Sequence, residues 1–311
     1  GEIYIGCAGG KGPRVYFTYK EKETPKGYFW FRAEVKGLRG GHSGSDIDKG
    51  YGNANKILAR FLHSLTRKKY GMVLSEIGGG NLHNAIPREA TAFAAVPYAE
   101  KETVRVILNM FIATLEDEYK DIEPNIRISL ESEALPELVM DKSTSDNLLH
   151  VLYACPHGVI AMSRDIPGLI ETSTNLASVK MMSNNQVEIN TSQRSAAESS
   201  KNDLAAQMYA IFALSGAEII QSDGYPGWKP NVNSAILKKT SEAYKKLFGE
   251  EPKVKAIHAG LECGLFLEKY PHLDMVSIGP QMYGVHSPDE RLSINSTQKT
   301  WEWLLEILKS C

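Results

Sequence analysis

Hydrophobic and polar residues alternate along the segment YFWFRAEVKGL, from Tyr28 to Leu38. One face of this alternation carries Phe29, Phe31, Ala33 and Val35, and the other carries Trp30, Arg32, Glu34 and Lys36. A period of two residues is typical of a strand with one buried and one solvated face. The segment is therefore predicted to be a half-buried strand.

The next part of the chain predicts helices and further strands. Apolar residues at helical spacing mark two helices, one with Ile57, Leu58, Phe61, Leu62 and Leu65 and one with Val104, Ile107, Leu108, Phe111 and Leu115. Strands are predicted around 70–78, 90–97 and 126–131. The glycine-rich segment GLRGGHSGSD, which follows the first strand, is predicted to be irregular.

A similar order of elements follows. We predict a helix near 143–153, then a hairpin of strands 168–182 and 185–193 that turns at Asn184-Asn185. A helix with Leu204, Met208, Ile211 and Phe212 facing inward begins after Ser200 and stops at Gly216, and a short strand, AEIIQS, closes the group. The two groups predict α/β sandwich subdomains with antiparallel sheets.

The segment DGYPGWKPN, residues 223–231, is the best domain boundary, because proline and glycine interrupt it repeatedly. Beyond it we predict a helix at 234–248 and strands at 253–257 and 274–278. A last helix is predicted to bury Trp301, Leu304, Leu305 and Leu308, with Asn295 and Gln298 as a capping box. Alternating helices and strands predict a mostly parallel sheet, to which residues 1–16 could add an edge.

Composition excludes several classes of protein. The chain has 311 residues, 42% of them hydrophobic and 23% charged, as in soluble globular proteins. A net charge of −2 argues against a nucleic-acid partner, and no apolar run is long enough to span a membrane. The four scattered cysteines lack a C-x-x-C spacing, which fits a reducing, cytoplasmic location and argues against a structural zinc site.

Two histidines stand in loops suited to chemistry. His286, in GVHSPDE, lies between a glycine-containing turn and carboxylates, a setting that suits a zinc ligand but is also that of an ordinary surface loop. His42, in GGHSG, is flanked by glycines that allow a ligand to approach closely, although a flexible turn explains the pattern equally well.

Three further positions could contact a ligand, and each also has an ordinary structural explanation. Asn84 precedes Ile86-Pro87 and could bind a carbonyl or carboxylate, or simply form a turn. Arg194 ends a strand and could bind a carboxylate through both nitrogens of its guanidinium, or be solvated. Gly260, in IHAGLECGLF, could admit a ligand to the backbone; His258 and Cys263 beside it are more typical of packed residues.

Taken together, these motifs resemble one family. The chain carries, in order, GEIYIGCAGG, GLRGGHSG, GNANKILARFL, NAIPREA, GYPGWKPN, IHAGLECGLF, DMVSIGP and HSPDE. Their order and spacing are similar to those of the aminoacyl-histidine dipeptidases, the carnosine-type Xaa-His peptidases of the di-zinc aminoacylase/carboxypeptidase superfamily. The resemblance covers essentially the whole chain.

The resemblance implies a domain organisation. Residues 1–16 correspond to the end of the first half of a catalytic α/β domain, residues 17–222 to a lid domain of two subdomains, and residues 223–311 to the C-terminal catalytic half. It also implies roles: His286 as a zinc ligand, His42 as the group that stabilises the oxyanion, and Asn84, Arg194 and Gly260 as substrate contacts. Arg194 would hold the free C-terminal carboxylate.

The family binds two zinc ions, and its other ligands precede the segment that GEIYIGCAGG resembles. We therefore expect this chain to be a fragment that is inactive alone, and the parent enzyme to hydrolyse dipeptides with a C-terminal histidine by zinc-activated water. A homodimer is compatible with this prediction. A related zinc carboxypeptidase or N-deacylase, and a non-catalytic assembly module, remain alternatives.

Overall fold

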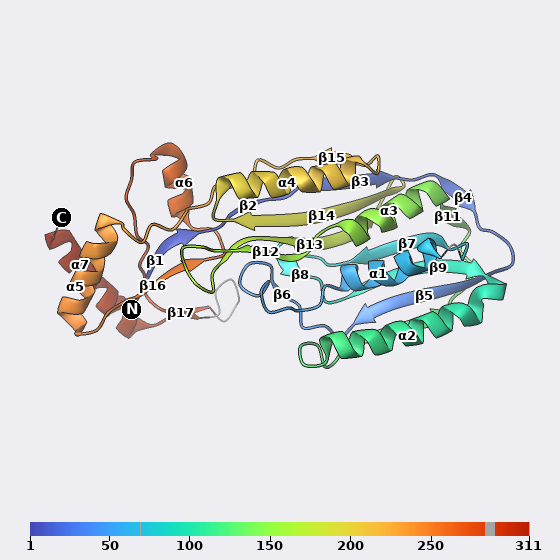
Figure 1. Ribbon diagram of the computed structural model, residues 1–311, viewed down its shortest axis with the longest axis horizontal. Coiled ribbons are helices and arrows are strands. Elements are labelled where there is room, and N and C mark those ends of the chain that lie inside the picture. Colours follow the sequence, from blue (N-terminus) through green and yellow to red (C-terminus); the bar gives the residue numbers. More distant parts are fainter. Residues whose placement is uncertain (69, 284–289, 311) are drawn as a thin grey trace.

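The computed structural model describes residues 1–68, 70–283 and 290–310, and it is elongated (Figure 1). Most of its length is a ten-stranded sheet whose principal strands follow the spatial order β10-β5-β9-β7-β13-β14-β3-β15. Their bounds are β3 Arg14–Thr18, β5 Tyr28–Lys36, β7 Val73–Gly79, β9 Ala90–Pro97, β10 Arg127–Ser132, β13 Ile170–Met182, β14 Gln186–Ser195 and β15 Glu218–Ile220. Two further strands, β2 (Gly9–Lys11) and β12 (Gly158–Met162), pair with β14 and β13.

Four helices pack on this sheet around one hydrophobic core (Figure 1). They are α1 Ala54–Arg67, α2 Lys101–Tyr119, α3 Lys142–Ala154 and α4 Glu198–Ala213, and a 3-10 turn, Tyr98–Glu100, precedes α2. The central helices α1 and α3 contact each other, while α2 flanks α1 and α4 flanks α3. All five apolar residues predicted to face inward on α1 are buried.

The two predicted groups of elements therefore share one sheet. They join where β7 lies beside β13, through the pair Gly79 and Val179. The antiparallel hairpin β13–β14 turns at Asn184-Asn185 as predicted, and both asparagines have positive φ angles, 69° and 57°. The domain boundaries at residues 16 and 222 stay a prediction; β3 runs across the first of them.

Two short strand pairs lie beside the large sheet. One joins β4 (Glu21–Glu23) to β11 (Leu138–Met140), and the other joins β6 (Gly41–His42) to β8 (Ala85–Ile86). Because Val139 of β11 covers Trp30 and Ala95, Trp30 is buried. The prediction that Trp30 faces solvent with the polar residues of β5 is therefore wrong.

The remaining elements form a smaller unit at the other end of the molecule (Figure 1). Its strands β1 (Glu2–Cys7) and β16 (Lys253–Ile257) are parallel, as predicted. Its helices are α5 Ala235–Phe248, α6 Glu262–Lys269 and α7 Ile294–Lys309, and β17 (Met282–Tyr283) pairs with β18 (Arg291–Leu292). The predicted strand at 274–278 is absent from these described residues, where Ser277 forms only an isolated bridge with Tyr4.

The last helix packs through a different face from the one predicted. Trp303 and Ile307 are buried against Ile3, Ile5 and Tyr244, whereas the predicted residues Trp301, Leu304, Leu305 and Leu308 are exposed. The helix is capped by Ser293, whose hydroxyl accepts a hydrogen bond from the N–H of Ser296, and not by the predicted box of Asn295 and Gln298.

Candidate functional site

His42 is held in a fixed orientation by the backbone that follows it. Its Nδ1 accepts hydrogen bonds from the N–H groups of Gly44 and Ser45, at 3.1 and 3.2 Å. Since Nδ1 acts as an acceptor, a neutral ring carries its proton on Nε2. The loop therefore selects the tautomer in which Nε2 is a hydrogen-bond donor.

The carboxylate of Asp46 stabilises the same loop. Asp46 Oδ2 accepts a hydrogen bond of 2.7 Å from the backbone N–H of His42. Burial raises the pKa of Asp46, but the hydrogen bonds from Lys49 and from the His42 N–H outweigh this and leave the pKa below its ordinary value. Asp46 consequently stays ionised at neutral pH and fixes the loop.

Asn84 lies beside His42. The N–H of Ser43 donates to the carbonyl oxygen of Asn84 at 2.8 Å, and His42 pairs with Ala85 across β6 and β8. The amide of Asn175 donates to the carbonyl of Ala85 at 2.8 Å, which ties this pair to β13. Two predicted site residues that are distant in sequence are thus adjacent.

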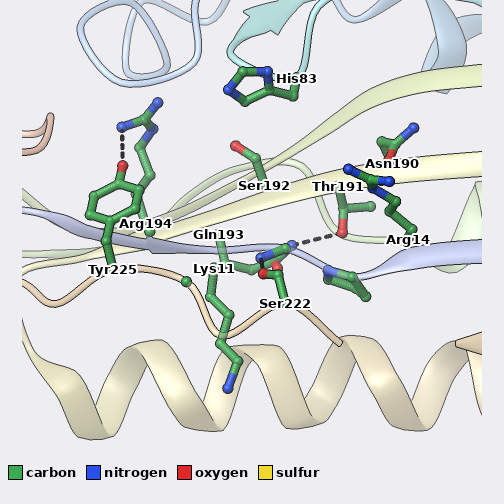
Figure 2. A pocket seen from close by; sticks show the side chains of 14 residues that line it. Lys11, Arg14, His83, Asn190, Thr191, Ser192, Gln193, Arg194, Ser222 and Tyr225 are labelled. Atoms are coloured by element: carbon green, nitrogen blue, oxygen red, sulfur yellow. Dashed lines mark hydrogen bonds between the residues drawn. The ribbon is translucent and has the colours of Figure 1, made fainter. Parts of the chain in front are cut away.

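Arg194 is buried in β14, with 8% of its surface exposed. Its Nη1 donates a 3.0 Å hydrogen bond to the hydroxyl of Tyr225, as Figure 2 shows, while its Nε has no partner in the part of the chain that the structure describes. Tyr225 is itself fixed, because its backbone exchanges two hydrogen bonds with Gly10 of β2. The guanidinium is therefore preorganised and incompletely satisfied, which suits the binding of an anionic group.

Gly260 lies against the ring of Tyr225. A Cβ added at Gly260 would stand 3.0 Å from Cε2 of that ring, closer than van der Waals contact allows. The glycine therefore permits the tyrosine to reach Arg194.

His258 lies among these groups, although its sequence context predicts only a packed residue. It is buried, and its Nε2 makes a 2.7 Å hydrogen bond with the hydroxyl of Ser173, the residue paired with Arg194 across β13 and β14. Burial lowers the pKa of His258 to about 4, and the charge of Arg194 and that of His42 act in the same direction. A Cβ at Gly44 would lie 2.4 Å from the carbonyl oxygen of His258 and 3.1 Å from Cε1 of His42, so both histidines border this glycine.

Four of the five predicted site residues therefore belong to one region, with Tyr225 and His258 between them. The fifth, His286, lies outside the described residues. Within the described ranges, no group of three or more His, Cys, Asp or Glu residues could hold a metal ion. Those residues alone do not fit a zinc centre.

Comparisons with known proteins show what this chain is similar to. Residues 25–123 match the peptidase dimerisation domain of the M20 peptidases. The chain is 40% identical over 309 residues to the cytosol non-specific dipeptidase of Escherichia coli (strain K12), a match that covers 99% of this chain and 63% of that protein. It also matches the crystal structure of aminoacylhistidine dipeptidase from Vibrio alginolyticus with a TM-score of 0.93 and 37% identity, over 100% of this chain and 63% of the other.

The resemblance to dipeptidases of the M20 family, predicted from the motifs, is thereby confirmed, as is the α/β class with an antiparallel and a parallel sheet. The chain spans 63% of the length of each of these two relatives. None of the described helices is long and apolar enough to cross a membrane.

Proposed function

We propose that this chain supplies the substrate-binding and oxyanion-stabilising part of a metallo-dipeptidase that acts on Xaa-His dipeptides in the cytoplasm. The observation that carries the proposal is the convergence of His42, Asn84 and the buried Arg194 in one region. Similarity to the two dipeptidases supports the reaction class.

The proposed binding mode follows from the donors. Arg194 binds the free carboxylate of the dipeptide, because its guanidinium is buried and no described residue pairs with its Nε. The tautomer of His42 presents an N–H, which suits the oxygen of the scissile carbonyl as negative charge develops there. The side-chain amide of Asn84, beside His42, orients the peptide.

Two zinc ions are the proposed cofactors, and they would supply the activated water. His286 is the proposed ligand from this chain. Because the described residues form no metal-binding group, we propose that the 311-residue chain alone retains less than stoichiometric zinc and does not turn over Xaa-His dipeptides. Two firmly bound zinc ions in elemental analysis, or rapid hydrolysis, would contradict this part of the proposal.

Carboxylate recognition is tested by binding, which does not depend on turnover. Gly-His and its C-terminal amide are titrated into the chain and followed by NMR. We expect Gly-His to bind at least about tenfold more tightly than the amide, since a charge-assisted bidentate pair contributes roughly 1.5–3 kcal/mol. Arg194→Gln should abolish the difference, whereas Arg67→Gln, at the end of α1, should leave it unchanged. Equal binding of dipeptide and amide would reject the assignment, and tighter binding of N-acetylhistidine would favour an N-deacylase.

A further inference from the structure

A cavity of about 260 Å³ continues from Arg194 along β14, beyond the groups assigned above. Figure 2 shows Ser192 and Arg194 on the same side of this strand, with His83 facing them across the cavity. Arg14 of β3 closes the far end, since it pairs with Asn190 across β3 and β14. The cavity therefore runs between two arginines.

The charge of the lining is one-sided. Among the residues that the structure describes, Lys11, Arg14 and Arg194 line the cavity, and no aspartate or glutamate does. Within the described ranges none of these three cations forms an ion pair. A nearby carboxylate, Glu188, already accepts hydrogen bonds from Asn190 and Tyr16. Positive charge is thus left unneutralised by the lining.

Hydrogen-bonding capacity is also left unused. The hydroxyl of Ser192 and the Nε of Arg194 are buried and have no hydrogen-bond partner among the described residues. They lie two residues apart on one face of β14, so both can reach the same ligand. Leaving a buried donor without a partner is unfavourable, and a ligand with acceptor oxygens removes this cost.

We propose that this cavity is a subsite for a second carboxylate, and that it extends the ligand range to dipeptides with an acidic C-terminal residue. The α-carboxylate lies at Arg194, and the side-chain carboxylate accepts hydrogen bonds from Ser192 and His83 and faces Arg14. The inference rests on the proposed function, because it uses Arg194 as the anchor of the main-chain carboxylate. A glutamate side chain reaches further along β14 than an aspartate side chain and fits better.

Lys11 provides a matched control within the same cavity. Figure 2 shows its side chain pointing away from Ser192 and His83, towards the neighbouring helix. Lys11→Gln and Arg14→Gln remove the same charge from the same lining, but only Arg14 faces the proposed carboxylate. A site-specific effect is therefore separable from a general change of electrostatic field.

The experiment compares Gly-Glu with its neutral isostere Gly-Gln by NMR titration of the chain. We expect Gly-Glu to bind about threefold to tenfold more tightly, the difference to vanish in Arg14→Gln, and Lys11→Gln to preserve it. Ser192→Ala is a smaller change and should reduce the difference in affinity between Gly-Glu and Gly-Gln. This variant tests the subsite even if Arg14→Gln does not fold. Glutarate, a free dicarboxylate, should compete with Gly-Glu if the subsite accepts any dicarboxylate, and its competition would support the shared chemistry.

The outcomes separate the two proposals. Equal affinity for Gly-Glu and Gly-Gln, with both weakened by Arg194→Gln, would overturn the subsite but not the proposed function. If Arg194→Gln weakens the binding of neither Gly-Glu nor Gly-Gln, the proposed function is overturned, and the subsite with it. An equal loss of preference in Lys11→Gln and Arg14→Gln would also overturn the subsite, since it would indicate only a general field.

Discussion

At the scale of single residues, the candidate site depends on side chains that burial holds in one protonation state. His258 is neutral at pH 7 because burial lowers its pKa to about 4. A protonated ring beside Arg194 would place two positive charges side by side in a buried region, which is unfavourable. The neutral ring of His258 therefore leaves Arg194 as the cation proposed to bind the carboxylate.

The lowered pKa predicts acid sensitivity. Between pH 6.5 and pH 4 an unfolded chain protonates His258 but the folded chain does not, so the free energy of unfolding falls as pH falls through this range. The largest loss from this residue is about 3 kcal/mol. We expect the free energy of unfolding of His258→Asn to decrease less between pH 7 and pH 4.5 than that of the unsubstituted chain. Urea denaturation at the two pH values measures this difference.

His157 gives the comparison for that measurement. Burial lowers its pKa to about 4 as well, with a further contribution from Lys56, but it lies beside Asn53 and not beside Arg194. His157→Asn should therefore flatten the stability profile without changing the affinity for Gly-His at pH 7. An unchanged profile in both variants would show that neither histidine is neutral in the folded chain.

Sequence patterns located individual site residues better than their partners. The glycine-flanked His42 and the strand-end Arg194 stand out in the sequence. The contacts of Arg194 with Tyr225, and of His258 with Ser173, join residues 31 and 85 positions apart. Local spacing contains no information about such pairs, because Tyr225 and His258 lie in segments that only the tertiary fold brings to β13 and β14.

At the scale of elements, regular alternation was predictable and the choice between two apolar faces was not. Helix α7 carries a stripe with the spacing i, i+3, i+4 and i+7 from Trp301, yet it packs through Trp303 and Ile307. The ring of Trp303 meets that of Tyr244 at 4.7 Å, and its indole N–H donates to the carbonyl of Thr240 at 2.9 Å. Periodicity identifies a helix but cannot decide which of two stripes faces the core.

The two tryptophans of α7 provide a direct test. Trp303→Ala should lower the free energy of unfolding by about 3–5 kcal/mol, because it leaves a cavity beside Tyr244 and an unpaired carbonyl. Trp301, which is 59% exposed, should cost less than about 1 kcal/mol when replaced by alanine. Urea denaturation followed by circular dichroism measures both. A larger cost at position 301 would mean that the helix packs through its other face.

The turn between β13 and β14 predicts a second element-scale result. Asn184 and Asn185 both adopt left-handed backbone conformations, which disfavour residues with a Cβ other than asparagine and aspartate. Asn184→Ala should destabilise the chain by about 1 kcal/mol. Asn185→Gly should be neutral or stabilising, since glycine accepts this conformation without strain. Thermal unfolding of the two variants checks this difference in stability, and equal destabilisation of both would contradict it.

At the scale of the whole molecule, the large sheet has two outer strands with different surroundings. Strand β10 lies at one edge beside α2, where Val106 and Met110 are 57% and 68% exposed. Strand β15 lies at the other edge, beside α4, after which Leu214 is 91% exposed. An uncovered edge strand can pair with another chain, and adjoining apolar residues add to the buried surface.

We predict that the chain forms a homodimer through β10 and α2, because the peptidase dimerisation domain matches residues 25–123, which include α2. Met110→Glu should raise the dissociation constant at least about tenfold, since it places a charge in the apolar part of the interface. Leu214→Glu adds the same charge at the opposite edge and should leave the dimer intact. Analytical ultracentrifugation over a range of concentrations measures both. If Leu214→Glu dissociates the dimer and Met110→Glu does not, the β15 edge is the interface; a monomer at all concentrations would reject self-association through either edge.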